Sequence, residues 1–240
     1  MTIGSRPGAE PRWLRPVDLA EGLGEPMLDE AGQIRQPLFV VDLDDDAEAA
    51  VVASAARAAS RSGRILVGVA TRDPLPPHLQ PLLDALDLSL VPVAAGGVRR
   101  EQIAVSDPID QAAELHALVS EHPQAATVLA GLLRWSGSLP GPAALDAESL
   151  AYSTLLGGTE FRRWLDRRGQ RPFPPPAPAD PVLVHRDGAA LHIALNRPER
   201  RNAYGREVRD ALVAALEIAV LDPEVDRVLI DGAGPAFCSG

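Results

Sequence analysis

The first part of the chain alternates between short, continuous apolar runs and longer stretches with helical periodicity. Apolar runs at 37–43 (PLFVVDL) and 64–70 (RILVGVA) predict strands that are buried on both faces, and a third strand is expected at 88–93. Between these runs, an Ala-rich stretch at about 46–62 and a segment at 78–86 predict helices. This alternation indicates an α/β unit with a parallel sheet and right-handed crossovers.

Helical periodicity dominates the next part of the chain. Helices are expected at 107–121, 125–135 and 144–168, the last with a break at Gly157-Gly158. Two acidic residues of the last helix, Glu160 and Asp166, are interpreted as part of a solvated face. Three acidic residues, Asp44–Asp46, are expected to cap the helix at 46–62, because carboxylates stabilise the positive end of a helix.

A proline-rich segment, QRPFPPPAPADP, divides the chain. It cannot continue a helix, so it predicts a linker between two domains. The segment before the first apolar run is rich in Gly, Pro and charge and is expected to be irregular. The expected parts are an irregular segment (1–36), an α/β N-terminal domain (37–173), a linker (174–181) and a C-terminal segment (182–240).

Beyond the linker, the pattern predicts a hairpin, a helix and a further strand. Strands at 182–185 and 190–195 are expected to pair across Arg186-Asp187-Gly188, because Asp-Gly is a strong turn signal. An amphipathic helix is expected at 206–221 and a buried strand at 227–231. The residues expected on the apolar stripe of the helix are Val208, Leu212, Ala215, Leu216 and Ala219.

Composition excludes several classes of function. The formal net charge is −10, from 33 acidic and 23 basic residues, and no basic stripe is present, which argues against nucleic acid or a membrane surface as partner. All the basic residues are Arg, so Schiff-base chemistry and a Walker-type phosphate loop are excluded within this sequence. A single cysteine, Cys238, leaves no internal disulfide and is expected to be a buried, inert thiol. With no apolar span or signal core, a cytoplasmic location is expected.

Two motifs frame the C-terminal segment: ALNRPERRNAY at 194–204 and GAGPAFCSG at 232–240. In this order and at this spacing they resemble the start of a crotonase (enoyl-CoA hydratase/isomerase) domain. The resemblance covers 181–240 and implies a truncated crotonase-type β-α-β start. It also implies action on an acyl-CoA thioester, with an enolate stabilised by two backbone N–H groups that form an oxyanion hole.

The same resemblance implies which residues face the substrate. Arg201 and Ala203 would flank the nucleotide or pantetheine arm of coenzyme A, either Arg200 or Arg201 could meet its phosphates, and Asn202 would brace its loop through side-chain-to-backbone bonds. In the second motif, the implied binding residues are Phe237, Ser239 and Gly240. The first oxyanion donor would follow Gly240, with the second donor and the catalytic carboxylates later still. The 240-residue chain is therefore expected to lack catalytic residues, to bind CoA weakly and to be inactive by itself.

For the intact protein, the resemblance implies hydration of an enoyl-CoA, with no cofactor other than the CoA of the substrate and with trimer-type homo-oligomers. Three alternatives stay open: a cofactor-independent dioxygenase of the dihydroxyphenylacetyl-CoA type, an acyl-CoA hydrolase or isomerase, and a non-catalytic interaction protein. Uncovered strand edges and helix faces would make the segment after the linker prone to aggregate or to remain partly disordered.

Three further patterns give competing hypotheses. Leu145–Phe173 resembles the ending of a crotonase domain, which suggests that 37–173 is a degenerate crotonase-like unit. The pair Asp42 and Asp44 after a buried strand has the spacing of a Mg²⁺-dependent phosphohydrolase, but no Thr or Lys completes that site, and helix capping explains the same acids. His185 and His192 lie on neighbouring hairpin strands and could come close, but exposed hairpin histidines are more often incidental than ligands.

Overall fold

The computed structural model describes residues 10–22, 26–72, 74–93, 100–170 and 179–239. By its internal contacts the chain divides into two compact units, Met1–Gln170 and Arg171–Gly240. Most of the linker expected at 174–181 lies outside the described residues. Among the described helices, none combines the length and apolar character that crossing a bilayer requires.

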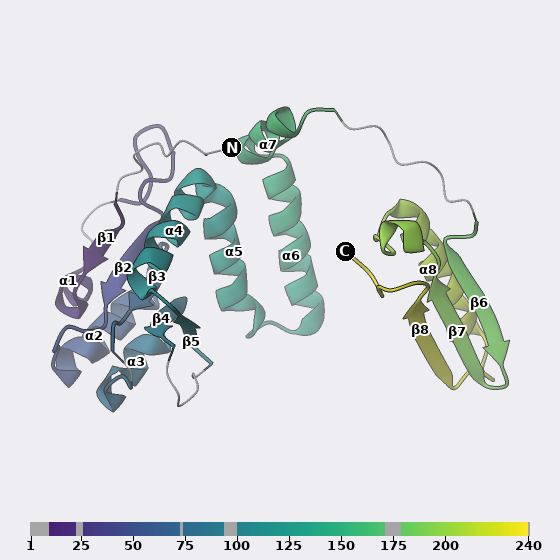
Figure 1. Cartoon of the computed structure of the whole chain (residues 1–240), viewed down its shortest axis with the longest axis horizontal. Helices are drawn as coiled ribbons and strands as arrows, with labels where there is room; N and C mark the ends of the chain where they lie inside the picture. Colours follow the sequence, from purple (N-terminus) through teal and green to yellow (C-terminus); the bar gives the residue numbers. More distant parts are fainter. Residues whose placement is uncertain (1–9, 23–25, 73, 94–99, 171–178, 240) are drawn as a thin grey trace. The chain divides into compact units, whose positions relative to one another are not determined.

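The first unit contains a five-stranded sheet in which every neighbouring pair is parallel (Figure 1). The strands follow one another across the sheet in chain order: β1 (Arg12–Leu14), β2 (Leu38–Asp42), β3 (Ile65–Val69), β4 (Leu88–Pro92) and β5 (Gln102–Val105). The predicted α/β class and the three predicted strands are confirmed. The two edge strands were not predicted, because they are short and carry no continuous apolar run.

The prediction that 1–36 is irregular is wrong in part. Arg12–Leu14 pairs with Phe39–Val41 of β2, and α1 (Pro16–Glu21) follows directly. The Asp18 side chain accepts hydrogen bonds from the backbone N–H and the guanidinium of Arg15, which fixes the start of α1 and lowers the pKa of Asp18. Leu19 is fully buried, so this segment belongs to the core of the first unit.

Two separate cores explain why the central strands are apolar on both sides. Alternate residues of a strand point to opposite faces, so Phe39 and Val41 enter one core and Leu38 and Val40 the other. Successive strands joined by right-handed crossovers place their helices on one face. On that face lie α1, α2 (Ala49–Ala59) and α3 (Gln80–Leu83), the last preceded by the 3₁₀ turn η1 (Pro77–Leu79). The other face is covered by α4 (Pro108–Glu121) and α5 (Pro123–Ser136).

The predicted capping of α2 by Asp44–Asp46 is wrong. The helix begins after Glu48, and no side chain caps it. The carboxylate of Asp44 instead accepts hydrogen bonds from the backbone N–H (2.8 Å) and hydroxyl (2.6 Å) of Thr71 and pairs with Arg72. These partners follow β3, the neighbour of β2, and a sequence pattern confined to one segment contains no sign of such a cross-strand contact.

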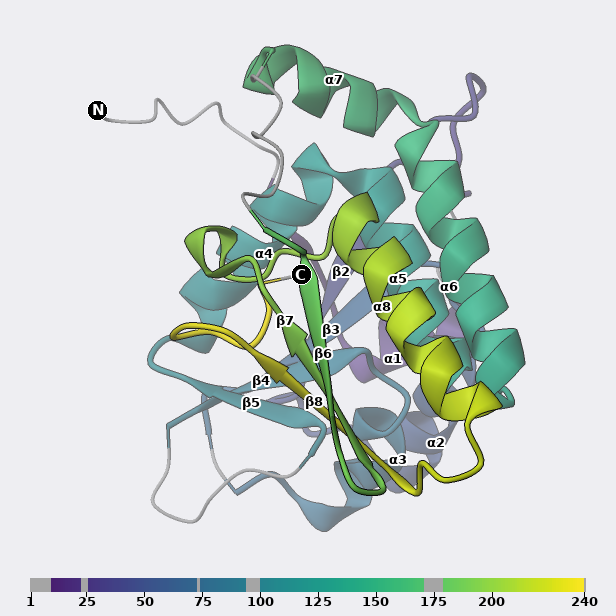
Figure 2. The same cartoon turned by 90° about the vertical axis from the view of Figure 1, so that its right-hand side faces the viewer.

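The remaining helices of the first unit are α6 (Gly141–Leu156) and α7 (Thr159–Arg168), and the predicted break at Gly157-Gly158 is confirmed. Figures 1 and 2 show α5 and α6 side by side. Glu160 does not lie on a solvated face, because it is buried and accepts hydrogen bonds from the backbone N–H groups of Gln124 (2.7 Å) and Ala125 (3.0 Å). It therefore caps the first turn of α5 from another helix.

The second unit is a three-stranded sheet with one helix. Its elements are β6 (Val182–Asp187), β7 (Ala190–Leu195), the 3₁₀ turn η2 (Pro198–Arg200), α8 (Arg206–Leu221) and β8 (Arg227–Gly232). The hairpin turn is Gly188-Ala189, two residues later than the start that the sequence predicts, and Gly188 has a φ of +58°. The bounds predicted for α8 are confirmed, and Val208 and Ala215 of its predicted stripe are buried against β7. The predicted burial of β8 is wrong, since Val228, Leu229 and Ile230 are all exposed.

The strand pairings of the two units differ. In the first unit all the strand pairs are parallel, whereas the second begins with the antiparallel pair β6–β7 and adds β8 in parallel to β7. The strands β2 and β3 nevertheless pair in parallel, as β7 and β8 do. The hypothesis that 37–173 is a degenerate crotonase-like unit stays a prediction.

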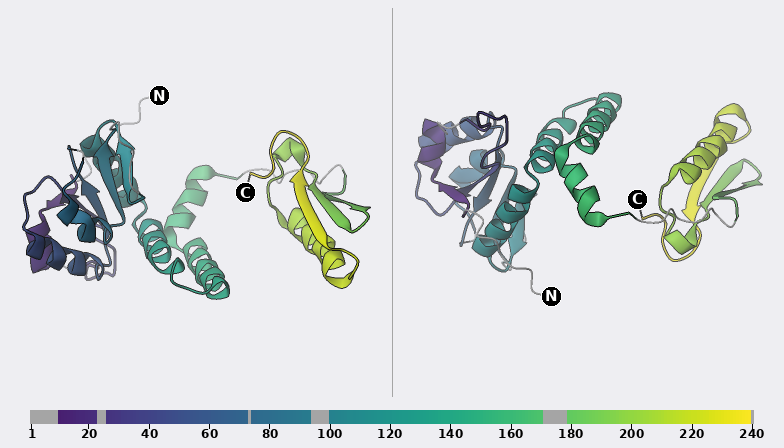
Figure 3. Two further views of the ribbon diagram at one scale, coloured as in Figure 1. Left: turned by 90° about the horizontal axis from the view of Figure 1, so that it is seen from below. Right: turned by 90° about the horizontal axis from the view of Figure 1, so that it is seen from above.

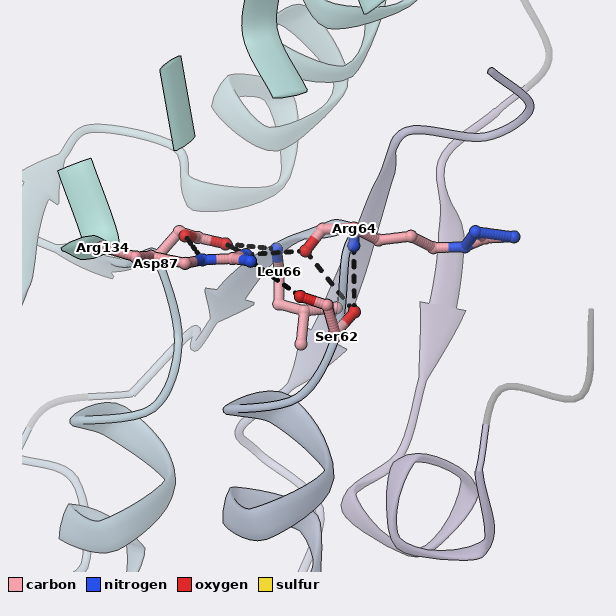
Figure 4. A network of polar contacts seen from close by, with 5 residues as sticks. All are labelled: Ser62, Arg64, Leu66, Asp87 and Arg134. Carbon is pink, nitrogen blue, oxygen red and sulfur yellow. Dashed lines mark hydrogen bonds and ion pairs between the residues drawn. The ribbon is translucent and has the colours of Figure 1, made fainter. Parts of the chain in front are cut away.

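One arginine links three parts of the first unit (Figure 4). The guanidinium of Arg134 on α5 donates to both carboxylate oxygens of Asp87 (2.7 and 2.6 Å) and to the carbonyls of Ser62 and Arg64 (both 2.7 Å). Asp87 also accepts from the backbone N–H of Leu66 (2.8 Å). Because the fork of Arg suits a bidentate contact with a carboxylate, this network fixes α5 against the segments that enter β3 and β4.

We expect Arg134→Leu to lower the free energy of unfolding of the first unit by about 2–3 kcal/mol, since it leaves the mostly buried Asp87 carboxylate and two carbonyls without their donor. Arg61→Leu, at an exposed position, is the matched control and should change it by less than about 0.5 kcal/mol. Urea denaturation followed by circular dichroism measures both. Equal effects of the two variants would show that the network does not contribute to the stability of the first unit.

Candidate functional site

The two sequence motifs form two loops at one edge of the second sheet. The first motif loop (196–205) follows β7, and the second motif loop (233–239) follows β8. Because β7 and β8 are parallel neighbours, their carboxyl ends meet at the same edge. The pairing continues into the second loop, where the Ala233 N–H donates to the carbonyl of Leu195 (2.8 Å). Residues more than thirty positions apart are thereby brought together.

Asn202 joins the two motif loops. Its side chain is fully buried, and its Oδ1 accepts a hydrogen bond from the Arg197 N–H (2.7 Å) within the first loop. Its Nδ2 donates to the carbonyls of Ala233 (3.0 Å) and Ala236 (2.8 Å) in the second loop. The predicted bracing of its own loop is confirmed, and the contacts with the second loop go beyond it. A buried amide bound at both ends fixes the separation and register of the loops.

Close packing requires glycine at two positions of this junction. A Cβ on Gly232 would lie 2.5 Å from the Phe237 carbonyl oxygen and 2.8 Å from Asn202 Nδ2. Gly234 has a φ of +82°, and a Cβ there would lie 2.8 Å from the Cβ of Pro198. These glycines let the backbone of the second loop approach the first loop more closely than any side chain would allow.

Arg197 supports the first loop and was not singled out in the sequence. Its side chain is only 4% exposed and forms ion pairs with Glu199 (2.6 Å) and with Glu207 of α8 (2.8 Å). The hydrogen bond from Arg197 is the main cause that lowers the pKa of Glu199. The ion pair with Glu207 holds the first loop on α8, and the ion pair with Glu199 lies within the loop. The position of Arg197, close behind the apolar end of β7, was the only sign in the sequence that its side chain could be buried.

The residues that the resemblance assigned to binding lie mainly on the outside of the two loops. Arg201 is exposed with a φ of +51°, Ala203 is partly buried, and Phe237 is 59% exposed. The hydroxyl of Ser239 donates to the Arg200 carbonyl (3.4 Å), which connects the loops a second time. Gly240 lies outside the described residues.

Cys238 also belongs to the junction, since its thiol donates to the Asn202 carbonyl (3.1 Å). The sequence predicts a buried thiol, but the side chain of Cys238 is only partly buried. No group of three or more potential metal ligands occurs among the residues that the structure describes.

Comparison with known proteins finds relatives for about a quarter of the chain. A stretch of 61 residues is 46% identical to a probable enoyl-CoA hydratase of Mycobacterium tuberculosis, covering 25% of this chain and 24% of that protein. Over 63 residues the chain is 43% identical to the 1,4-dihydroxy-2-naphthoyl-CoA synthase of the same species, covering 23% and 20%. About a quarter of the chain has enoyl-CoA hydratase/isomerase (crotonase superfamily) relatives. The chain spans about a quarter of the length of the curated relatives it matches.

The chain also matches solved structures over a similar share of its length. A probable enoyl-CoA hydratase/isomerase from Mycobacterium abscessus is 39% identical over 26% of this chain and 25% of its own, with a TM-score of 0.26. No family model matches the chain. The predicted family resemblance is confirmed for about a quarter of the chain, and the roles of the individual binding residues stay predictions.

We expect Asn202→Gly to lower the free energy of unfolding of the second unit by about 2–4 kcal/mol, because three backbone groups lose their partner. Glycine tolerates the φ of +54° at this position, so the variant isolates the side chain. Hydrogen exchange of the Arg197 amide measures the effect locally and should accelerate. Asn196→Ala, which removes one bond to the Asp180 carbonyl, is the control. An unchanged exchange rate of the Arg197 amide in Asn202→Gly would show that the Asn202 side chain does not hold the loops together.

A second prediction concerns the glycines. Gly232→Ala should force the two loops apart, because its Cβ has no room beside the Phe237 carbonyl, and should cost about 2–3 kcal/mol of stability. Gly205→Ala provides the matched control, since a Cβ there meets nothing within 4 Å and its φ is −95°. Thermal unfolding and the amide spectrum of 232–239 report the outcome. A Gly232→Ala chain as stable as Gly205→Ala would refute the close approach.

Proposed function

We propose that this protein acts on acyl-CoA thioesters as an enolate-stabilising enzyme of the enoyl-CoA hydratase/isomerase type. We further propose that the joined motif loops form the part of its site that faces coenzyme A. The junction made by Asn202 carries this proposal, because it gives the two family-like motifs a common, fixed geometry. The names of the relatives supply the substrate class, since by name the first of the two curated proteins above hydrates an enoyl-CoA and the second makes a naphthoyl-CoA.

The physical demands of this chemistry fit the loops. An enolate oxyanion is stabilised by backbone N–H groups that are held in position before the reaction, so the protein must fix main chain and keep side chains out of the way. Gly232 and Gly234 allow main chain to lie close to main chain, and Asn202 prevents the loops from separating. The proposal therefore assigns these residues to positioning and leaves proton transfer to other groups.

Charge and exposure suit the CoA side of the substrate. Arg200 and Arg201 are exposed on the first loop, and guanidinium groups form strong, charge-assisted hydrogen bonds with phosphates. Ala203, Phe237 and Ser239 are proposed to contact the pantetheine arm or the acyl group, and Gly240 is proposed at the thioester. CoA enters as part of the substrate, and no separate cofactor is proposed.

Hydration of an enoyl-CoA is the proposed reaction, and its product separates it from the alternatives. Hydration gives a 3-hydroxyacyl-CoA and removes the conjugated double bond, isomerisation moves that bond, hydrolysis releases free CoA, and dioxygenation consumes O₂. Mass spectrometry of the CoA products with an O₂ electrode distinguishes these outcomes. Self-association of the protein is proposed as well and is testable by light scattering.

The binding proposal is tested by titrating the isotope-labelled 240-residue chain with crotonyl-CoA and following amide signals. We expect weak binding, with the largest shifts at Arg201, Ala203, Phe237 and Ser239. Arg201→Ser should weaken binding about three- to tenfold, as expected for loss of one exposed phosphate contact, whereas Arg209→Ser on exposed α8 should not.

Two outcomes would overturn the proposal. One is a set of shifts confined to the first unit, and the other is equal binding of crotonyl-CoA by the Arg201→Ser and parent chains together with no shifts in either motif loop. Crotonyl-pantetheine, which lacks the nucleotide phosphates, serves as the ligand control and should be insensitive to Arg201→Ser.

A further inference from the structure

The open face of the second sheet carries a pair of histidines that the proposed function does not use. Leu191 and Ile193 are buried beneath α8, which covers one face of the sheet (Figure 3). Side chains alternate along a strand, so His192 points to the opposite face. His185 lies directly across from it on β6 and shares that face. His185 is exposed and His192 is half-buried.

We propose that His185 and His192 form a two-histidine chelate for a divalent transition-metal ion, with water in the remaining coordination positions. The ring centroids are 6.4 Å apart and the ring planes are inclined by 48°. An ion bonded to one nitrogen of each ring at about 2.0–2.1 Å lies roughly 3.2 Å from each ring centre, so the observed separation corresponds to an ion held in line between the two rings. A rotation of the exposed His185 side chain that brings the ring centres about 1 Å closer gives the bent angle of tetrahedral coordination.

The surroundings of the pair favour a cation. By the strand register, two acidic residues, Asp187 and Asp231, share the face of the two histidines. One basic residue, Arg227, also lies on that face, opposite Ala190. The chain as a whole carries a formal charge of −10. On β8, the neighbour of His192 is Leu229, whose side chain offers no competing charge. Imidazole ligands suit Cu²⁺, Ni²⁺ and Zn²⁺, and affinity for a given nitrogen site is highest for Cu²⁺ in this series.

The chelate would have a structural consequence. It would bridge β6 and β7 near the middle of the hairpin, five residues or fewer from its turn at Gly188-Ala189. An ion that binds the folded hairpin and not the unfolded chain stabilises the folded state by mass action. Stability of the second unit would then respond to metal, independently of any acyl-CoA ligand, because both motif loops lie at the carboxyl ends of β7 and β8.

The test is titration of the 240-residue chain with CuCl₂ at neutral pH, followed by electron paramagnetic resonance. We expect one Cu²⁺ per chain with the spectroscopic signature of two imidazole nitrogens. His185→Gln and His192→Gln should each lower the affinity by at least about tenfold, since the second imidazole of a chelate acts at high effective concentration. His78→Gln, an exposed histidine of the first unit, is the matched control and should leave the signature unchanged.

A measurement on the unsubstituted chain keeps the test independent of variant folding. Substoichiometric Zn²⁺ should shift the ring NMR signals of His185 and His192 together, and lowering the pH should release the ion because ligating histidine must be deprotonated. Signals that move singly, a one-imidazole Cu²⁺ spectrum, or binding that survives both substitutions would overturn the proposal. Crotonyl-CoA titration in the His192→Gln chain should be unaffected, so failure of this site is distinguishable from failure of the proposed function.

Discussion

The C-terminal unit depends on one buried amide. Parallel pairing of β7 and β8 brings two loops to the same edge of the sheet, and Asn202 converts this proximity into a fixed arrangement. The amide is suited to this position because it accepts at one end and donates twice at the other. Because the amide is buried, each of its hydrogen bonds must form: a buried polar group without a partner destabilises the fold by more than a typical hydrogen bond stabilises it.

The residues around the amide follow from this constraint. Gly232 and Gly234 are required because the loops approach at backbone distance, and Arg197 is drawn inward because Glu199 and Glu207 satisfy its charge. Arg201 and Phe237 are exposed on the outside of the loops. This separation of inward residues that position the backbone from outward residues that can bind suits chemistry in which main-chain donors stabilise an oxyanion.

The first unit shows which parts of a fold a sequence pattern predicts. Positions 38–41 of β2 and all positions of β3 are apolar because both faces of the sheet are covered, so these strands were recognised. The edge strand β1 is three residues long and gains its structure from pairing with β2, which no local pattern reveals. Asp44 and Glu160 were misassigned for the same reason. Each carboxylate binds backbone N–H groups of another segment, brought near only by the packing of strands and helices.

The sequence by itself determined the α/β class, the helix and hairpin of the C-terminal unit, and the two motifs that relate about a quarter of the chain to enoyl-CoA hydratase/isomerase proteins. These features are local, because periodicity, turn residues and motif spacing are properties of contiguous residues. Only the tertiary structure decided that Asn202 spans both loops, that Glu160 caps α5, and that Asp44 binds Thr71. Those contacts join residues distant in sequence, and they exist because strand pairing and burial select one partner for each polar group.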